Sequence, residues 1–215
     1  MKKNYIFFDF DGTLVDSSEG IFYSIDKMLI DLNLAPLSIS QKRKFIGPPL
    51  ENSFQKYLGL DSSQALLATE IFRKYYKQKG TYLHSLYDGT KQMLEELKAK
   101  GKTLAVATSK PEVFANLILE NYGLKEYFSV VSGSSVSGGD NSKKDVLNRA
   151  ISLLGVKDLN ECVLIGDTVN DTKGANQVGI DCIGVLYGFG SEDELRNSGA
   201  AALAKTPLQV AQLID

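Results

Sequence analysis

The sequence has few of the residues that mark secreted or nucleic-acid-binding proteins. It contains two cysteines and one histidine among 215 residues, and its formal net charge is −2. Two cysteines in apolar runs make no disulfide framework, so we expect both to be reduced core residues. Because there is no excess of basic residues, we expect no nucleic acid and no anionic membrane surface as a partner.

Long hydrophobic runs are also absent. No apolar run reaches the roughly 20 residues that span a bilayer, so we expect no membrane segment. The opening residues MKKNYIFFDF reach an acid too soon for a secretion signal. Hydrophobic residues make up 43% of the chain, enough for a real core. A cytoplasmic enzyme or binding protein is therefore expected.

Short apolar runs alternate with helical patterns along most of the chain. Continuous apolar strands are typical of a parallel sheet that is buried on both faces. The predicted fold class is therefore α/β, with a doubly wound parallel sheet. Strands are expected at residues 5–8, 103–107, 129–132, 162–165, 181–185 and 200–204. Helices are expected at residues 90–100, 111–122, 143–154, 168–178, 192–197 and 208–214.

One interval breaks this alternation. Residues 17–83 carry no strand signal, but three helical patterns, GIFYSIDKMLIDL, LENSFQKYL and SSQALLATEIFRKYY. So many helical residues are too many for a single crossover between strands. The sequence therefore predicts an α/β core made of residues 1–16 and 84–215, with a helical domain, residues 17–83, inserted after the first strand.

Polar residues follow several of the expected strands. Asp9 and Asp11 come at the end of the first strand, Thr108 at the end of the second and Asp167 at the end of the fourth. In open parallel sheets, ligands bind at the carboxyl ends of the strands. We therefore expect these residues to gather at one edge of the sheet.

The acids at these strand ends indicate a metal site. Asp9 and Asp11 repel one another when both are ionised, and a cation relieves that repulsion. Mg²⁺ prefers oxygen ligands and often takes one or two carboxylates. Asp171 follows Asp167 by four residues, which puts both acids on one face of a helix's first turn. Helix capping explains either of these two acids alone, but it does not explain acids at two strand ends.

Lys143 and Lys144 stand in the first turn of an expected helix that Asn141 or Ser142 would cap. Cations there oppose the helix dipole, and broken local rules are frequent at functional sites. We expect Lys143 to point at the acids and Lys144 to be solvated.

The segment LAVATSKPE, in which Thr108 ends a strand, offers both a binding group and a cap. Ser109 with Glu112 fits a capping box, so its role is predicted to be mainly structural. The Thr108 hydroxyl precedes that cap and is placed to donate to an anion, which a helix N-terminus also attracts.

Taken in order, these motifs resemble the haloacid dehalogenase superfamily of phosphohydrolases. The resemblance is carried by DFDGT, by a Thr after the second strand, by a Lys, and by GDTVND. The helical insertion resembles the cap domain of that superfamily. The stretches GTLVDSSEGI, FIGPPLENSF and VATSKPE are most similar to the bacterial phosphoglycolate phosphatase-like group.

The resemblance implies a role for each matching residue. Asp9 would attack phosphorus and become an aspartyl phosphate. Asp11 would protonate the leaving oxygen and then activate water. Thr108 and Lys143 would bind the transferring phosphoryl oxygens, and Gly12 would let backbone N–H groups approach the phosphate.

It also implies a bound Mg²⁺. The Asp9 side chain, the Asp11 backbone carbonyl and Asp167 would hold this ion. Asp171 would support a metal-bound water or orient Lys143.

The expected reaction is hydrolysis of a small phosphomonoester similar to phosphoglycolate. Dehalogenases of the superfamily lack an acid at the position of Asp11, so the resemblance implies phosphoryl transfer rather than dehalogenation. Phosphosugar mutases carry a His and an Arg where this chain has Ile21 and Leu50, so mutase activity is less expected. A 5′-nucleotidase and an inorganic pyrophosphatase stay open as alternatives. A receiver-type switch and a non-catalytic binding protein fit the motifs less well.

Substrate choice is expected to lie in the cap. Arg43, in the basic cluster KRK, would meet a substrate carboxylate or second phosphate, although a solvated helix face is the simpler explanation of the cluster. The expected partner is a small phosphorylated metabolite, and the chain is expected to be a monomer or a homodimer.

Overall fold

The computed structural model describes residues 1–135 and 142–215. The chain divides into two compact units, which we describe separately. The α/β unit comprises Met1–Val15 and Leu86–Asp215, and the helical unit comprises Asp16–Ser85. No helix in the described part of the chain is long and apolar enough to cross a bilayer.

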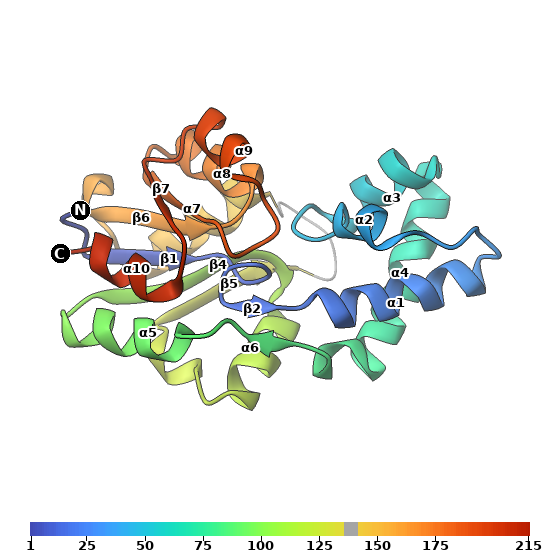
Figure 1. Ribbon diagram of the computed structural model, residues 1–215, viewed down its shortest axis with the longest axis horizontal. Helices are drawn as coiled ribbons and strands as arrows, with labels where there is room; N and C mark the ends of the chain where they lie inside the picture. Colours follow the sequence, from blue (N-terminus) through green and yellow to red (C-terminus); the bar gives the residue numbers. More distant parts are fainter. Residues whose placement is uncertain (136–141) are drawn as a thin grey trace. The chain divides into compact units, whose positions relative to one another are not determined.

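The α/β unit is built on a six-stranded sheet with the order β5-β4-β1-β6-β7-β8 (Figure 1). Its strands are β1 (Tyr5–Phe8), β4 (Thr103–Pro111), β5 (Val130–Ser134), β6 (Cys162–Gly166), β7 (Asp181–Val185) and β8 (Ala202–Ala204). All neighbouring strands are parallel, and β1 lies between β4 and β6. The predicted fold class, an α/β fold with a parallel sheet, is confirmed.

Helices cover both faces of this sheet, as Figure 1 shows. They are α5 (Thr90–Ala99), α6 (Glu112–Asn121), α7 (Lys143–Leu154), α8 (Val169–Val178), α9 (Glu192–Asn197) and α10 (Pro207–Leu213). The side chains of α5, α6 and α10 share one hydrophobic core with Ile6 and Phe8. Those of α7 and α8 share a second core with Phe7. Because successive strand residues alternate between the two faces, both cores require apolar residues, which explains the unbroken run YIFF.

The end of β4 differs from the prediction. The strand continues to Pro111, and its pairing with β5 shifts register between Ala107 and Pro111. Ser109 therefore lies inside the strand, and Pro111 is the N-cap of α6 without a side-chain hydrogen bond. The predicted capping box of Ser109 and Glu112 is wrong, because the Glu112 carboxylate instead accepts the Gly133 N–H at 3.3 Å.

The helical unit contains α1 (Ser18–Asp31), α2 (Ile39–Arg43), α3 (Leu50–Leu58) and α4 (Ser62–Gln78), followed by the 3₁₀ turn η1 (Gly80–Tyr82). Aromatic rings fill its centre: Phe54 lies 5.5 Å from Phe45 and 6.4 Å from Phe72 between ring centroids. The chain passes between the units along two short paired strands, β2 (Val15–Asp16) and β3 (Ser85–Leu86).

Candidate active site

The chain leaves β1 in a tight turn that carries Asp9 and Asp11. The Asp9 N–H still follows the sheet and donates to the Ile165 carbonyl on β6 at 2.8 Å. The Phe10 carbonyl then accepts the N–H of Leu14 at 3.0 Å, which folds the chain back on itself. Both acids are therefore held at the carboxyl end of the central strand, where ligands bind in sheets of this kind.

Gly12 packs this turn directly against the end of β6. Its φ of +85° lies in the left-handed region, and a Cβ at this position would lie 2.0 Å from Oδ2 of Asp167. The Thr13 hydroxyl donates to Oδ1 of the same carboxylate at 3.4 Å. The absence of a side chain at Gly12 is thus required by a carboxylate of the site.

Three carboxylates meet at this point, and all three are almost fully buried. Asp9 is 4% exposed, and Asp167 and Asp171 are 0% exposed. One oxygen from each lies within 4.8 Å of the other two. Asp171 also closes a capping box at the start of α8, because its Oδ2 accepts the N–H and the hydroxyl of Thr168, both at 2.9 Å. Asp171 therefore both caps α8 and belongs to the carboxylate cluster.

Lys143 is the cation of this cluster. Its Nζ lies 2.6 Å from Oδ1 of Asp9 and 2.9 Å from Oδ1 of Asp171. It also donates to the Ala107 carbonyl on β4 at 3.2 Å. The side chain thereby ties α7 to the end of β1 and to β4.

The start of α7 explains which lysine reaches the cluster. Ser142 is the N-cap and forms a capping box with Asp145. From this start, Lys143 is buried and Lys144 is exposed. The other cap candidate, Asn141, lies outside the described residues.

The charges of the cluster do not balance. Burial, followed by repulsion from Asp171, raises the pKa of Asp9 from 3.8 to about 7, although Lys143 and Thr108 act to lower it. Burial and the charges of Asp171 and Asp9 also raise the pKa of Asp167 well above its usual value. Burial acts to lower the pKa of Lys143, but the neighbouring carboxylates raise it, so this lysine stays charged.

One lysine thus faces three buried carboxylates, and the cluster is short of positive charge. Oxygen donors from carboxylates are the ligands that hard divalent cations prefer. The donor set therefore fits a divalent metal ion.

The end of β4 contributes Thr108 and a residue that the sequence analysis missed. Thr108 is 1% exposed, and its Oγ1 accepts the N–H of Lys110 at 3.1 Å. The Nζ of Lys110 lies 2.9 Å and 3.2 Å from the two carboxylate oxygens of Asp11. A signal was present, because residues two apart in a strand lie on the same side, which places Lys110 beside Thr108.

A family comparison matches most of this chain. The model of the haloacid dehalogenase-like hydrolases matches residues 6–185, which include all the strand-end acids of the site. The chain belongs to this family. The family that its motifs predicted is confirmed.

Several relatives of this hydrolase carry names. It is 39% identical over 191 residues to a 5′-nucleotidase of Pseudomonas aeruginosa, covering 89% of this chain and 86% of that protein. It is 36% identical to the tyrosine-protein kinase PtkA of Mycobacterium tuberculosis, covering 87% of this chain but 64% of the kinase. It is 30% identical over 206 residues to a phosphoglycolate phosphatase of Colwellia psychrerythraea, covering 92% and 91% of the two chains.

A solved structure is also similar to this hydrolase. The crystal structure of a protein described as a predicted phosphatase from Clostridium acetobutylicum superposes with a TM-score of 0.95. The two chains are 39% identical, and the match covers 99% of this chain and 98% of the other. Together, the family, the relatives named 5′-nucleotidase and phosphoglycolate phosphatase, and this solved structure support a phosphatase.

A loop after β7 completes the hydrolase's site, and the sequence analysis did not single it out. The Phe189 N–H donates to Oδ2 of Asp167 at 2.8 Å. The glycines on either side allow this approach, since a Cβ at Gly188 would lie 2.3 Å from Cβ of Asp167 and a Cβ at Gly190 would lie 2.1 Å from its carbonyl oxygen. The sequence held a signal for this loop, because the alternating glycines of YGFG come shortly after a predicted strand.

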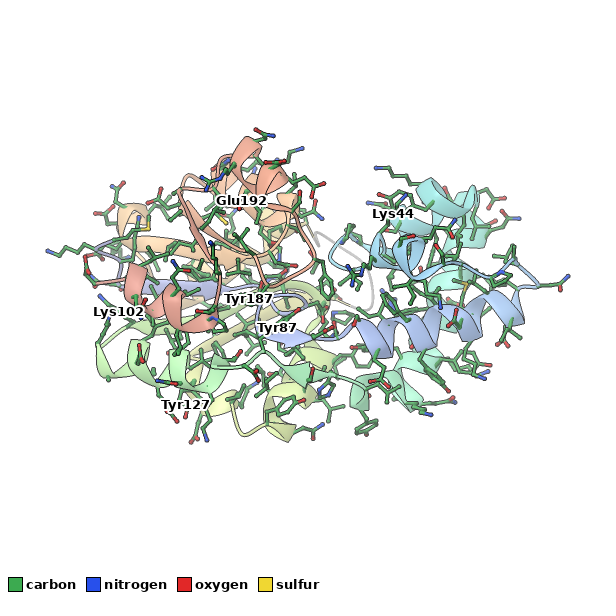
Figure 2. All side chains as sticks on the ribbon, viewed as in Figure 1. Lys44, Tyr87, Lys102, Tyr127, Tyr187 and Glu192 are labelled. Carbon is green, nitrogen blue, oxygen red and sulfur yellow. The ribbon has the colours of Figure 1, made fainter. Side chains whose placement is uncertain are left out.

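The same loop holds the turn that follows β1. The Tyr187 hydroxyl donates to the Thr13 carbonyl at 3.1 Å. Its ring lies 4.9 Å from that of Tyr87 between centroids, and Figure 2 shows the two side by side. Burial, with the nearby charge of Asp167, raises the pKa of Tyr187, so this phenol stays neutral.

Two other residues that the sequence analysis singled out, Ser109 and Arg43, are not members of the carboxylate cluster. Ser109 lies within β4 and is only partly buried. Arg43 is exposed on α2 of the helical unit, whereas its neighbour Lys42 is buried and pairs with Asp26 at 2.5 Å. A substrate-binding role for Arg43 stays a prediction.

Proposed function

We propose that this hydrolase is a Mg²⁺-dependent phosphatase that cleaves a small phosphomonoester through an aspartyl phosphate formed on Asp9. One observation carries the proposal. The Asp9 carboxylate lies at the end of the central strand, 2.6 Å from the Lys143 ammonium and beside the carboxylates of Asp167 and Asp171. A buried carboxylate that is paired with a cation and adjoins further acids is suited to act on a phosphoryl group.

The reaction proceeds in two steps. In the first, a carboxylate oxygen of Asp9 attacks phosphorus, the bond from phosphorus to the ester oxygen breaks, and Asp11 gives that oxygen a proton. In the second, Asp11 takes a proton from water, the water oxygen attacks phosphorus, and the bond to Asp9 breaks. One acid–base residue therefore serves both steps, while Thr108 and Lys143 bind the phosphoryl oxygens.

Three groups of this chain would hold the Mg²⁺: the Asp9 side chain, the Asp11 backbone carbonyl and Asp167. Asp171 lies beside them and orients Lys143. When bound, Mg²⁺ neutralises the negative charge that accumulates between the attacking carboxylate and the phosphoryl oxygens. The shortage of positive charge in the cluster supports this assignment.

For the substrate, we propose a small phosphorylated carboxylic acid similar to phosphoglycolate. The helical unit would act as the cap that sets substrate choice, and the exposed Arg43 on α2 would meet the substrate's carboxylate or second phosphate. The chain would work as a monomer or a homodimer, without nucleic acid or membrane.

A nucleoside 5′-monophosphate is the second candidate substrate. It is favoured by the 39% identity to a 5′-nucleotidase over 86% of that protein's length. The chemistry at Asp9 and Asp11 is the same for both candidates, so only a substrate comparison separates them.

The test is phosphate release with and without Mg²⁺. The panel contains 2-phosphoglycolate, nucleoside 5′-monophosphates, pyrophosphate and p-nitrophenyl phosphate. Because one relative is a tyrosine kinase, ATP with a tyrosine peptide is a further arm. Asp9→Asn tests the nucleophile, and the exposed Asp193→Asn is the matched control.

The proposal expects release that needs Mg²⁺, disappears in Asp9→Asn and persists in Asp193→Asn. The preferred substrate then decides between the two candidates. Full activity of Asp9→Asn, or no release from any ester by the folded wild type with Mg²⁺, would overturn the proposal.

A further inference from the structure

Lys110 is a buried lysine that the proposed reaction does not yet use. Its side chain is 4% exposed, and the Asp11 side chain that it meets is 12% exposed. Its Nζ contacts both oxygens of the Asp11 carboxylate, at 2.9 Å and 3.2 Å. Burying a lysine is costly, so a buried pair of this kind at a reactive acid calls for a functional account.

The backbone around Lys110 is unusual, and it sets the direction of the side chain. The pairing of β4 with β5 shifts register between Ala107 and Pro111. Within that irregularity, the Thr108 hydroxyl oxygen accepts the Lys110 N–H at 3.1 Å. On the side of the turn, Nζ lies 5.7 Å from the centre of the Phe10 ring, next to Asp11 in the chain. Lys110 is therefore fixed at its backbone and at its tip.

The two buried lysines of the site serve different acids. Lys143 lies 2.6 Å from Asp9 and 2.9 Å from Asp171. Lys110 pairs with Asp11 instead. The attacking acid and the proton-transferring acid of the proposed reaction thus each have their own cation, on different elements, α7 and β4.

We propose that Lys110 is a positioning residue that holds the Asp11 carboxylate in one orientation for both proton transfers. This inference rests on the proposed function, since it assigns Lys110 to the acid–base residue of that reaction. Asp11 is in the turn that follows β1, and its side chain is partly buried. Without Lys110, this side chain could rotate among several rotamers. Misplacement of a reacting group lowers the rate even when the group itself is present.

This role predicts a dependence on the leaving group. An alkoxide leaves only as it takes a proton, so cleavage of an alkyl phosphate needs Asp11 in the first step. p-Nitrophenolate is stable as an anion and leaves without a proton, so only the second step, attack by water, then needs Asp11. Loss of Lys110 should therefore slow both steps for alkyl esters, but only the second step for the aryl ester.

The experiment compares ethyl phosphate and p-nitrophenyl phosphate in the full-length protein with Mg²⁺. Lys110→Met removes the charge, Asp11→Asn gives the reference pattern, and Lys91→Met, an exposed lysine of α5, is the matched control. Steady-state kcat and KM are measured for both esters. Rapid mixing then follows the first turnover of p-nitrophenyl phosphate.

We expect Lys110→Met to lower kcat for ethyl phosphate about 100-fold, at the lower end of general acid–base effects. With p-nitrophenyl phosphate, it should release one equivalent of nitrophenolate in a burst and then turn over slowly, as Asp11→Asn does. KM should change little. In a double variant that combines Lys110→Met with Asp11→Asn, the loss of kcat should be no larger than in Asp11→Asn alone, because both substitutions act through the Asp11 carboxylate.

Three results would overturn the inference. The first is an equal loss on both esters without a burst and with a raised KM, which would make Lys110 a phosphate-binding cation. The second is unchanged kinetics in Lys110→Met. The third is a double variant whose loss of kcat equals the product of the losses in the two single variants. If Lys110→Met does not fold, Lys110→Arg keeps the charge and should retain the wild-type leaving-group dependence; an arginine variant with the Asp11→Asn pattern would contradict positioning by a simple cation.

The proposed function fails separately. A folded wild type that cleaves neither ester, or an Asp9→Asn variant with full activity, overturns the reaction itself and the role of Lys110 with it. A wild type that is active and sensitive to Asp9→Asn, combined with one of the three results above, overturns only the role of Lys110.

Discussion

Gly12 lies against the carboxylate of Asp167, although Gly12 belongs to the turn after β1 and Asp167 follows β6. A Cβ at Gly12 would lie 2.0 Å from Oδ2 of Asp167 and 2.7 Å from the Phe189 ring. The same Oδ2 accepts the Phe189 N–H at 2.8 Å. The glycine is therefore needed for the position of a carboxylate as well as for the turn itself.

Gly12→Ala should lower both stability and metal binding. The left-handed backbone alone costs about 1–2 kcal/mol for a non-glycine residue. Gly155→Ala measures that cost by itself, because Gly155 has φ +65° and open space around its Cβ position. We expect the melting temperature to fall more in Gly12→Ala than in Gly155→Ala, and the Mg²⁺-dependent rise in melting temperature to be lost only in Gly12→Ala. Equal effects in both variants would show that contact with Asp167 is unimportant.

Mg²⁺ should stabilise the protein more strongly at high pH. In the metal-free protein the pKa of Asp9 is raised from 3.8 to about 7, and that of Asp167 is raised too. Between pH 3.8 and about pH 7, the folded state holds a proton on Asp9 that the unfolded chain has released. The contribution of Asp9 to the free energy of unfolding therefore falls as the pH rises through this range. Mg²⁺ binds the ionised carboxylates and competes with those protons.

The measurement is the melting temperature with and without Mg²⁺ at about pH 5 and about pH 8, which lie below and above the pKa of Asp9 in the folded protein. We expect a larger rise with Mg²⁺ at the higher pH. Asp193→Asn should keep this difference, and Asp167→Asn should reduce it. An equal rise at both pH values would contradict binding at the Asp9, Asp167 and Asp171 cluster.

Lys143→Met should destabilise the fold much more than Lys144→Met. Removing one partner of a buried ion pair costs about 3–5 kcal/mol, because the remaining charge is left in a poorly solvated place. Lys143 has two such partners, Asp9 and Asp171. Lys144 is exposed, and its replacement should change the free energy of unfolding by less than about 0.5 kcal/mol. Urea unfolding of the metal-free variants decides this, and similar values for both would disagree with the structure.

Tyr187→Phe should have a moderate effect on stability. It removes the hydrogen bond to the Thr13 carbonyl but keeps the ring beside Tyr87. One such bond contributes about 1 kcal/mol, which corresponds to a fall of about 2–4 °C in the melting temperature of a chain this long. Tyr82→Phe, at a position that is 61% exposed, should leave the melting temperature unchanged. If both variants melt like the wild type, the bond contributes nothing to holding the turn.

The sequence by itself determined the α/β fold with its parallel sheet, because period and composition are local properties. The apolar runs around Phe7 and Cys182 require burial on both faces, and each helix between strands carries its own apolar side. The motif DFDGT and the later GDTVND also determined the family, since each is a short segment whose residues are neighbours in the chain.

Only the tertiary structure decided which side chains complete the site. The pairing of Lys110 with Asp11 depends on β4 lying next to β1, and the contact of Phe189 with Asp167 depends on a loop after β7 reaching the end of β6. Ser109 was misassigned for the same reason, because the extension of β4 to Pro111 follows from its pairing with β5. Contacts between distant strands arise from the register and packing of the whole sheet, and no local pattern encodes them.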